Sequence, residues 1–231
     1  MILQKTLVVG FCLMAWSPVA APQPFLQSFA VDVKELATQG EGPFYILKPG
    51  YRSTYEGKDG AKSGKLVITV LNETKAVGGV ETRIVEEREW NGGGELIEVS
   101  RNYFALHPAT GDVYYFGEDV DMYKNGKVVN HEGTWHHGSN GAKFGLLIPG
   151  KPTLGMRFYQ ELAKGVAMDR VEIVSLTDKL TTRAGAFDRC VKTKETTPLE
   201  PLAREYKFYA PGVGLVKDGD LDLVQQLSTH K

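Results

Sequence analysis

The fold class is decided by the stretch YYFGEDVDMYK (residues 114–124), NG (125–126) and KVVNHEGTWHH (127–137). Asn-Gly between two runs of alternating apolar and polar residues is the strongest short-range signal of a β-hairpin. Both central residues of a type I′ turn need positive φ, which Asn and Gly tolerate. A two-residue loop also fixes the register, so we predict an antiparallel hairpin in which Lys124 faces Lys127.

The predicted register places one set of side chains on a shared face, because alternate residues of a strand point the same way. Counting outward from the turn pairs Met122 with Val129, Val120 with His131, Glu118 with Gly133, Phe116 with Trp135, and Tyr114 with His137. Most of these side chains are apolar, so we expect this face to lie toward the core. A one-residue bulge in either strand would move the side chains beyond it to the opposite face.

Two polar side chains on this face, Glu118 and His131, are the candidate catalytic residues. They lie diagonally across the predicted pair, within reach of each other. A carboxylate beside an imidazole can act as an acid/base pair or contribute two metal ligands. The competing interpretation is a structural ion pair. The expected ligand-binding residues on the same face are Tyr114, Phe116, Met122, Trp135 and His137.

Metal binding by His131, His137 and Glu118 is an alternative that strand geometry disfavours. Six residues of extended strand separate the two histidines by about 20 Å, so both can bind one ion only if the strand bends. We therefore assign no metal ligands and expect no cofactor.

Composition indicates a single β-rich domain over residues 43–231. A chain of 231 residues is near the upper end for one β-domain. The 26 glycines and the repeated turn sequences favour an all-β fold, an antiparallel meander that forms a curled sheet or an open barrel. Basic residues number 27 against 28 acidic ones, and no long basic patch occurs, which argues against a nucleic-acid partner.

The N-terminus predicts export. Residues 1–21 resemble a signal peptide, with Lys5 before an apolar run over 6–16 and small residues over 17–21 that allow cleavage after Ala20 or Ala21. The apolar run is short for a membrane span, so we expect a secreted or periplasmic mature chain without a transmembrane segment. Residues 22–42 form a leader, in which Phe25, Phe29, Val33 and Leu36 have the spacing of a short helix.

Three segments together resemble a group of secreted or periplasmic bacterial β-rich proteins of uncharacterised function. They are PFYILKPG (residues 43–50), YYFGED (114–119) with its Asn125-Gly126 turn, and YAPGVGLV (209–216). The resemblance implies export and a β-meander, and it implies no catalytic residues.

We therefore predict an exported cell-envelope protein that binds a small or apolar ligand, such as a lipid, in a cavity of its sheet. The alternatives are a hydrolase or lyase that uses Glu118 and His131 as acid and base, and a metal-binding envelope protein that uses the same histidines. No complete catalytic motif accompanies Glu118 and His131, so an enzymatic role depends on those two residues alone. The sequence does not define the oligomeric state.

Overall fold

The computed structural model describes residues 23–57 and 64–228 and confirms the all-β fold. The strands are β1 (Gly40–Glu41), β2 (Ile46–Leu47), β3 (Arg52–Gly57), β4 (Lys65–Val77), β5 (Val80–Trp90), β6 (Leu96–Leu106), β7 (Val113–Lys124), β8 (Lys127–Asn130), β9 (Trp135–His136), β10 (Lys143–Ile148), β11 (Arg157–Tyr159), β12 (Glu161–Leu162), β13 (Arg170–Thr182), β14 (Gly185–Thr196), β15 (Glu205–Ala210), β16 (Gly214–Asp218) and β17 (Leu221–Leu227). The predicted signal peptide, residues 1–21, lies outside the described residues.

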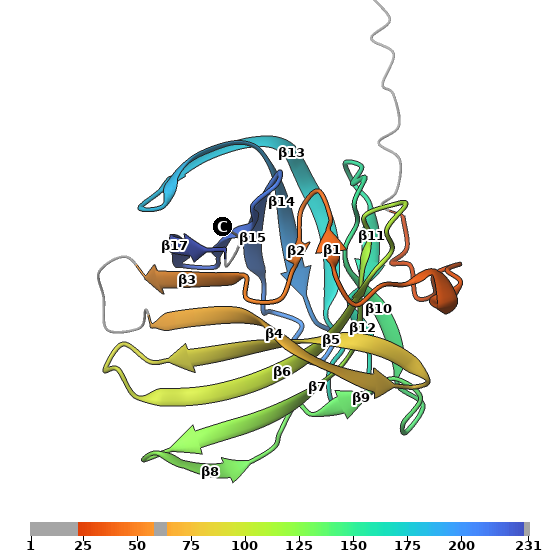
Figure 1. The fold of residues 1–231 in the computed structure, drawn as a ribbon, viewed down its shortest axis with the longest axis horizontal. Helices are drawn as coiled ribbons and strands as arrows, with labels where there is room; N and C mark the ends of the chain where they lie inside the picture. Colours follow the sequence, from red (N-terminus) through yellow and green to blue (C-terminus); the bar gives the residue numbers. More distant parts are fainter. Residues whose placement is uncertain (1–22, 58–63, 229–231) are drawn as a thin grey trace, which may run out of the picture.

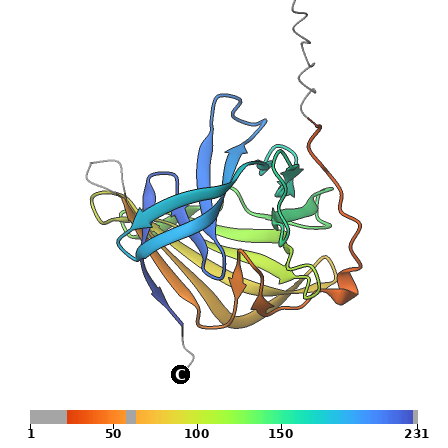
Figure 2. The same ribbon diagram turned by 90° about the horizontal axis from the view of Figure 1, so that it is seen from above.

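Nearly all of the strands belong to one antiparallel sheet, whose order is β11-β13-β14-β15-β16-β17-β3-β4-β5-β6-β7-β10-β12. Strands β3 to β7 and β13 to β17 are each neighbours in chain order, which confirms the predicted meander. The link between the two halves is the pairing of the last strand, β17, with β3. The sheet is strongly curved, as Figures 1 and 2 show.

One short segment brings the two ends of this sheet together. β11 pairs with β13 at one end, and β12 pairs with β10 at the other. Gln160 lies between β11 and β12, and its amide donates to Leu147 O at 3.1 Å. A Cβ on Gly145 would lie 2.3 Å from Gln160 O, so glycine permits the close approach of the two ends. The result is a sheet that is nearly closed into a barrel.

The long β13–β14 hairpin arches over β17 and β3 (Figure 1). At its tip, Ala184 N donates to Leu223 O at 3.3 Å. Arg183 forms an ion pair with Glu56 at 2.7 Å. These contacts fix the hairpin across one side of the barrel.

The leader differs from the expected helix. It contains a single 3-10 turn, η1 (Val33–Glu35), whose N-cap Asp32 accepts a hydrogen bond from Lys34 N at 3.0 Å. On either side of this turn the chain pairs with the barrel through bridges from Leu26 to Phe158 and from Ala37 to Leu106. No helix among the described residues has the length and apolar character needed to cross a membrane.

The central hairpin forms at the predicted turn, but its predicted register is wrong beyond the first pairs. Asn125 and Gly126 have φ of 53° and 72°, and Lys124 pairs with Lys127 as expected. A bulge at Val129 then shifts the register, so that Met122 pairs with Asn130. Glu118 pairs with Trp135 instead of Gly133, because the chain leaves the sheet between β8 and β9.

A second bulge lies in β7 itself. Tyr103 pairs with Gly117 and Phe104 with Tyr115, so that Phe116 is the extra residue. Gly117 has φ of 151°, and a Cβ there would lie 2.6 Å from Trp135 O. As a consequence Tyr115 and Glu118 share one face of β7, whereas side-chain alternation alone would have placed them on opposite faces.

Candidate functional site

The inner face of the barrel is identified by charges that interact across it. Burial raises the pKa of Glu87 on β5, and the ammonium group of Lys207 on β15 opposes this rise, although β16, β17, β3 and β4 lie between those strands in the sheet. Glu87 pairs with Ser100 on β6, and Lys207 with Thr193 on β14. These partners share a face, so both halves of the barrel turn their polar residues inward.

Acidic side chains gather around this interior, and we call them the carboxyl cluster. They influence one another's pKa, which places them within electrostatic range. The carboxyl cluster comprises Glu87, Glu89, Glu98, Glu118, Glu161, Asp169, Glu195, Glu205 and Asp218.

Lys207 is the cation that several of these carboxylates share. Its Nζ lies 3.2 Å from Glu195 Oε2 and 3.5 Å from Asp218 Oδ1. Burial lowers the pKa of Lys207, but Asp218 and Glu195 raise it more, and the net result is a pKa well above the ordinary value. Lys207 is therefore charged, and two carboxylates compete for its single positive charge.

The side chain of Glu195 is buried, and one of its two carboxylate oxygens accepts no hydrogen bond. The residue is 9% exposed, and its Oε1 atom has no hydrogen-bond partner among the described residues. Burial raises the pKa of this carboxyl to about 7, against the opposing effect of Lys207. A buried oxygen without a partner costs free energy, so it marks a place where a donor from outside the chain would be stabilised.

A cavity of about 330 Å³ opens beside Glu195, between the end of β14 and the start of β15. Further polar side chains line it: Asp169, Thr197, Glu200, Arg204 and Glu205. Asp169 and Glu205 also belong to the carboxyl cluster, and burial raises the pKa of each. The cavity therefore has an acidic rim above a buried carboxylate.

Glu118 lies in the same interior, in an aromatic setting. Tyr115 lies beside Glu118 and packs edge-on against Trp135, with ring centroids 5.2 Å apart. The hydroxyl of Tyr115 donates to Asn102 Oδ1 at 2.6 Å. Burial raises the pKa of Glu118 to about 7, although the nearby polar groups of Tyr115 and Trp135 oppose the rise.

The structure does not bring His131 to Glu118. The side chain of His131 is exposed, and its Nδ1 lies 2.9 Å from Asp121 Oδ1 and 2.9 Å from Val120 O. Asp121 and Glu118 point to opposite faces of β7, so the histidine belongs to the outer face. The bulge at Val129 is the physical cause of this separation.

The expected ligand-binding residues divide between the two faces. Trp135 lies inside with Glu118, and Met122 is partly exposed opposite Asn130. The other three pack in an aromatic group with Phe144, whose ring centroid lies 4.8 Å from that of Phe116, 5.9 Å from that of Tyr114 and 5.1 Å from that of His137. Among the described residues no group of three or more His, Cys, Asp and Glu side chains is arranged to hold a metal ion.

A polar network on the outer face was not predicted. Asp119 accepts hydrogen bonds from the Tyr103 hydroxyl and from Lys75 Nζ, the latter at 2.8 Å, and its other oxygen lies 2.8 Å from His136 Nε2. The pKa of Asp119 is lowered, because the contacts with Lys75, Tyr103 and His136 outweigh the effect of burial, which raises it. This network ties β4, β6, β7 and β9 together and leaves no buried oxygen of Asp119 unpaired.

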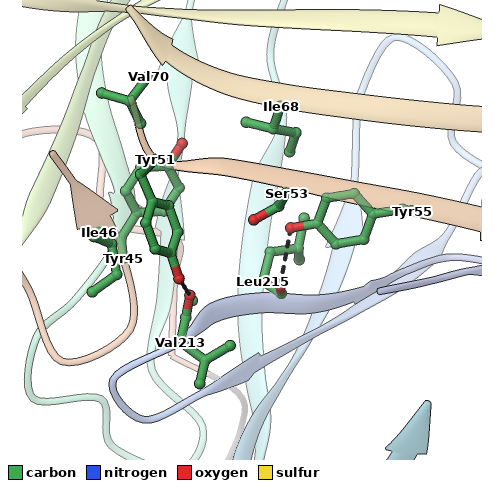
Figure 3. A pocket seen from close by; sticks show the side chains of 10 residues that line it. Tyr45, Ile46, Tyr51, Ser53, Tyr55, Ile68, Val70, Val213 and Leu215 are labelled. Atoms are coloured by element: carbon green, nitrogen blue, oxygen red, sulfur yellow. Dashed lines mark hydrogen bonds between the residues drawn. The ribbon is translucent and has the colours of Figure 1, made fainter. Parts of the chain in front are cut away.

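A pocket lined mainly by tyrosine and aliphatic side chains is small. It has a volume of about 30 Å³ and lies between β3, β4 and the start of β16, where Tyr51 and Tyr55 point toward the 213–215 segment (Figure 3). The Tyr51 hydroxyl donates to Val213 O at 2.9 Å, and the Tyr55 hydroxyl donates to Leu215 O at 3.0 Å. This space fits about one water molecule, so it does not accommodate a lipid chain.

Comparison with known proteins adds one weak likeness in structure. No protein-family model matches the chain, and no curated protein matches it significantly. A solved structure from Bacteroides fragilis, of a protein thought to be exported and described as having a YmcC-like fold, aligns with 81% of this chain and 100% of its own. The two chains are 17% identical, and the TM-score is 0.35.

Sequence reasoning missed the carboxyl cluster, although the sequence contains a sign of it. Glu86 and Glu87 are adjacent within β5, and successive side chains of a strand point to opposite faces. One of the two must therefore point inward in a closed sheet. Glu86 does lie outside, where it pairs with Arg88 at 2.7 Å, and Glu87 points inward.

Proposed function

We propose that the protein is an exported, non-covalent binding protein that takes a small polar ligand into the interior of its barrel. The observation that carries this proposal is a cavity of about 330 Å³ whose lining includes Glu195, a residue with one buried and unpaired carboxylate oxygen. Ligand cavities commonly have volumes of ~300–1,000 Å³ and a few convergent polar groups. Export rests on the sequence of residues 1–21.

The polar interior also favours a polar ligand over the apolar ligand considered from the sequence. An apolar ligand would have to cover the carboxylates of Glu87 and Glu118 without giving them hydrogen bonds, at a high cost in desolvation. The apolar space beside Tyr55 holds about 30 Å³, which is too little for an organic ligand. A small ligand with hydrogen-bond donors fits the interior better than a lipid.

A thermal-shift screen tests the proposal. A ligand that binds only the folded state adds about 2.7 kcal/mol of stability at a concentration one hundred times its Kd. The mature protein would be melted with cationic, anionic and neutral metabolites, each in a separate well at pH 8. We expect hits within one charge class. The absence of any concentration-dependent shift in all three classes would overturn the proposal.

A second candidate function is acid/base catalysis by Glu118. The observation that favours it is a pKa raised to about 7 by burial beside Tyr115 and Trp135, since groups poised near neutral pH cluster at catalytic sites. His131 has no part in this version, because it lies on the other face of β7. Glu118→Gln should abolish turnover of any ligand found in the screen while leaving its binding intact, and turnover by this variant would exclude the role.

A further inference from the structure

We infer that the outer face of the barrel carries a second binding site, and that its ligand is a sugar acid. Such a ligand combines one carboxylate with several hydroxyl groups and an apolar ring face. The inference goes beyond the proposed function, which concerns the interior. It depends on side chains of β14, β15 and β16 that point away from the interior, and on a cavity of about 390 Å³ that they line.

The strand register places these side chains on the outer face. Lys207 points into the barrel, so its neighbours Tyr206 and Phe208 point outward. Phe208 pairs with Lys192 on β14 and with Lys217 on β16, and side chains that are paired across strands share a face. Phe208 therefore lies between two lysines on the outer surface, and Tyr206 beside it is 39% exposed.

Lys192 is a cation that aromatic rings hold in place and no described carboxylate neutralises. Its Nζ lies 4.6 Å from the ring centroid of Tyr206 and 5.1 Å from that of Phe208. Cation–π contacts orient an ammonium group and leave its net charge uncompensated. Among the residues that the structure describes, no carboxylate forms an ion pair with Lys192. Its fixed charge therefore favours an anionic group in the ligand.

Arg204 adds a second uncompensated cation to the lining of this cavity. The residue is exposed just before β15, and within the described part of the chain no carboxylate pairs with it. A guanidinium group binds a carboxylate through two parallel hydrogen bonds. Lys217 contributes less to anion binding, because it already forms an ion pair with Asp222 at 2.7 Å.

Two acidic residues in the lining distinguish a sugar acid from a simple anion. Glu205 and Asp220 line the same cavity as the cations. Carboxylates repel anions but accept hydrogen bonds, so they favour a ligand that also carries hydroxyl donors. The rings of Tyr206 and Phe208 can pack against the carbon–hydrogen face of a sugar. The cavity volume also lies within the ~300–1,000 Å³ that is common for small-molecule sites.

Isothermal titration calorimetry with sodium D-galacturonate tests the inference on the mature chain at pH 7 and low ionic strength. We expect saturable binding with one site per chain. D-Galactose keeps the ring and lacks the carboxylate, so it should bind at least about tenfold more weakly. Sodium sulfate at the same concentration should not displace galacturonate. Equal binding of galactose, or displacement by sulfate, would overturn the inference.

Variants of the two central side chains locate the binding. Lys192→Gln removes the fixed charge and should weaken galacturonate binding by at least about tenfold. Its matched control is Lys127→Gln on the exposed strand β8, which should bind as the unchanged protein does. Tyr206→Leu removes the ring and should weaken binding several-fold, whereas Tyr206→Phe keeps the ring and should not. Equal affinities within either pair would overturn the inference.

The outcomes separate this inference from the proposed function, although Arg204 and Glu205 line both cavities. Loss of galacturonate binding in Lys192→Gln but not in Glu195→Gln would support the outer site. The reverse pattern would place the sugar acid in the interior, which overturns the inference and supports the proposed function. No galacturonate binding at millimolar concentration would overturn the inference alone, since the thermal screen tests the interior with other ligand classes.

Discussion

Glu195 and Lys207 form an ion pair inside the barrel in which only one of the two carboxylate oxygens is used. Oε2 lies 3.2 Å from Lys207 Nζ, whereas Oε1 is buried without a hydrogen bond, and Glu195 is one of the residues that line the cavity. Lys207 also contacts Asp218 at 3.5 Å, so it cannot compensate either carboxylate fully. This imbalance is the basis of the ligand-binding account.

The shared lysine should be important for stability. Replacement of Lys207 by Gln leaves Glu195 and Asp218 facing each other without their cation, and we expect the free energy of unfolding to fall by about 3 kcal/mol. Guanidinium denaturation at pH 7 measures it. The double variant with Glu195→Gln should recover part of the loss, because it removes one of the two uncompensated charges. A loss below ~0.5 kcal/mol would show that the pair behaves as an exposed surface pair.

Stability should fall as the pH rises through neutrality. Burial raises the pKa of Glu87 from 4.5 to about 8, with further rises from Asp218, Glu89 and Glu118 against the effect of Lys207. Between these values the folded state holds a proton that the unfolded state has released, so deprotonation favours unfolding. We expect a lower melting temperature at pH 8.5 than at pH 7.

Glu87→Gln provides the control for this pH effect, because it removes the titrating group and keeps its shape. The variant should lose less melting temperature between the two pH values than the unchanged protein, and it should melt higher than the unchanged protein at pH 8.5. Part of the pH effect remains, because Glu118 and Glu195, each with a pKa raised to about 7, still titrate. His137, whose pKa is lowered by burial from 6.5, acts in the opposite direction but only below the range compared. A melting temperature that rises from pH 7 to pH 8.5 would contradict the burial of Glu87.

The bulge at Gly117 should be intolerant of a side chain. Gly117→Ala would place a Cβ 2.6 Å from Trp135 O at φ of 151°, and both effects oppose folding of the β7–β9 pair. We expect a loss of about 2 kcal/mol or more in the free energy of unfolding. Gly93→Ala is the matched control: the nearest atom is the Asn91 side-chain oxygen at 3.2 Å, and φ is not in the left-handed region. Equal effects of the two substitutions would argue against the bulge.

The outer network should contribute to stability and not to ligand binding. Asp119→Asn loses the charge that holds Lys75, Tyr103 and His136, but solvent screens these partly exposed groups, so we expect a cost of about 1 kcal/mol. Asp188→Asn, at an exposed ion pair with Lys179, should cost less than ~0.5 kcal/mol. Denaturant unfolding measures both losses of stability. A change in ligand affinity in Asp119→Asn would show that the network takes part in ligand binding.

The sequence predicted the all-β class and the hairpin turn because those depend on local chemistry. Asn125 and Gly126 adopt positive φ, as a type I′ turn requires. The faces of β7 were not predictable in the same way. They depend on the bulges at Val129 and around Gly117, each of which shifts the strand register by one residue.

The candidate site was also predictable only in part, because its geometry depends on the strand register and on the curvature of the sheet. Glu118 was identified from its aromatic neighbours, and Trp135 does lie beside it, but His131 was assigned to it through a register that the bulge alters. Glu195 and Lys207 lie on the adjacent strands β14 and β15. Glu87 lies on β5 and comes within electrostatic range of Lys207 because the sheet is curved. No local pattern distinguishes an inward carboxylate of a closed sheet from an outward one of a flat sheet.

Native mass spectrometry of the protein purified from its own envelope, compared with the denatured mass, tests the ligand-binding account most directly. We predict an excess mass that is released on denaturation, belongs to a small polar ligand, and is absent from Glu195→Gln prepared in the same way. Identical native and denatured masses for the unchanged protein, at several protein concentrations and at pH 8, would contradict the account.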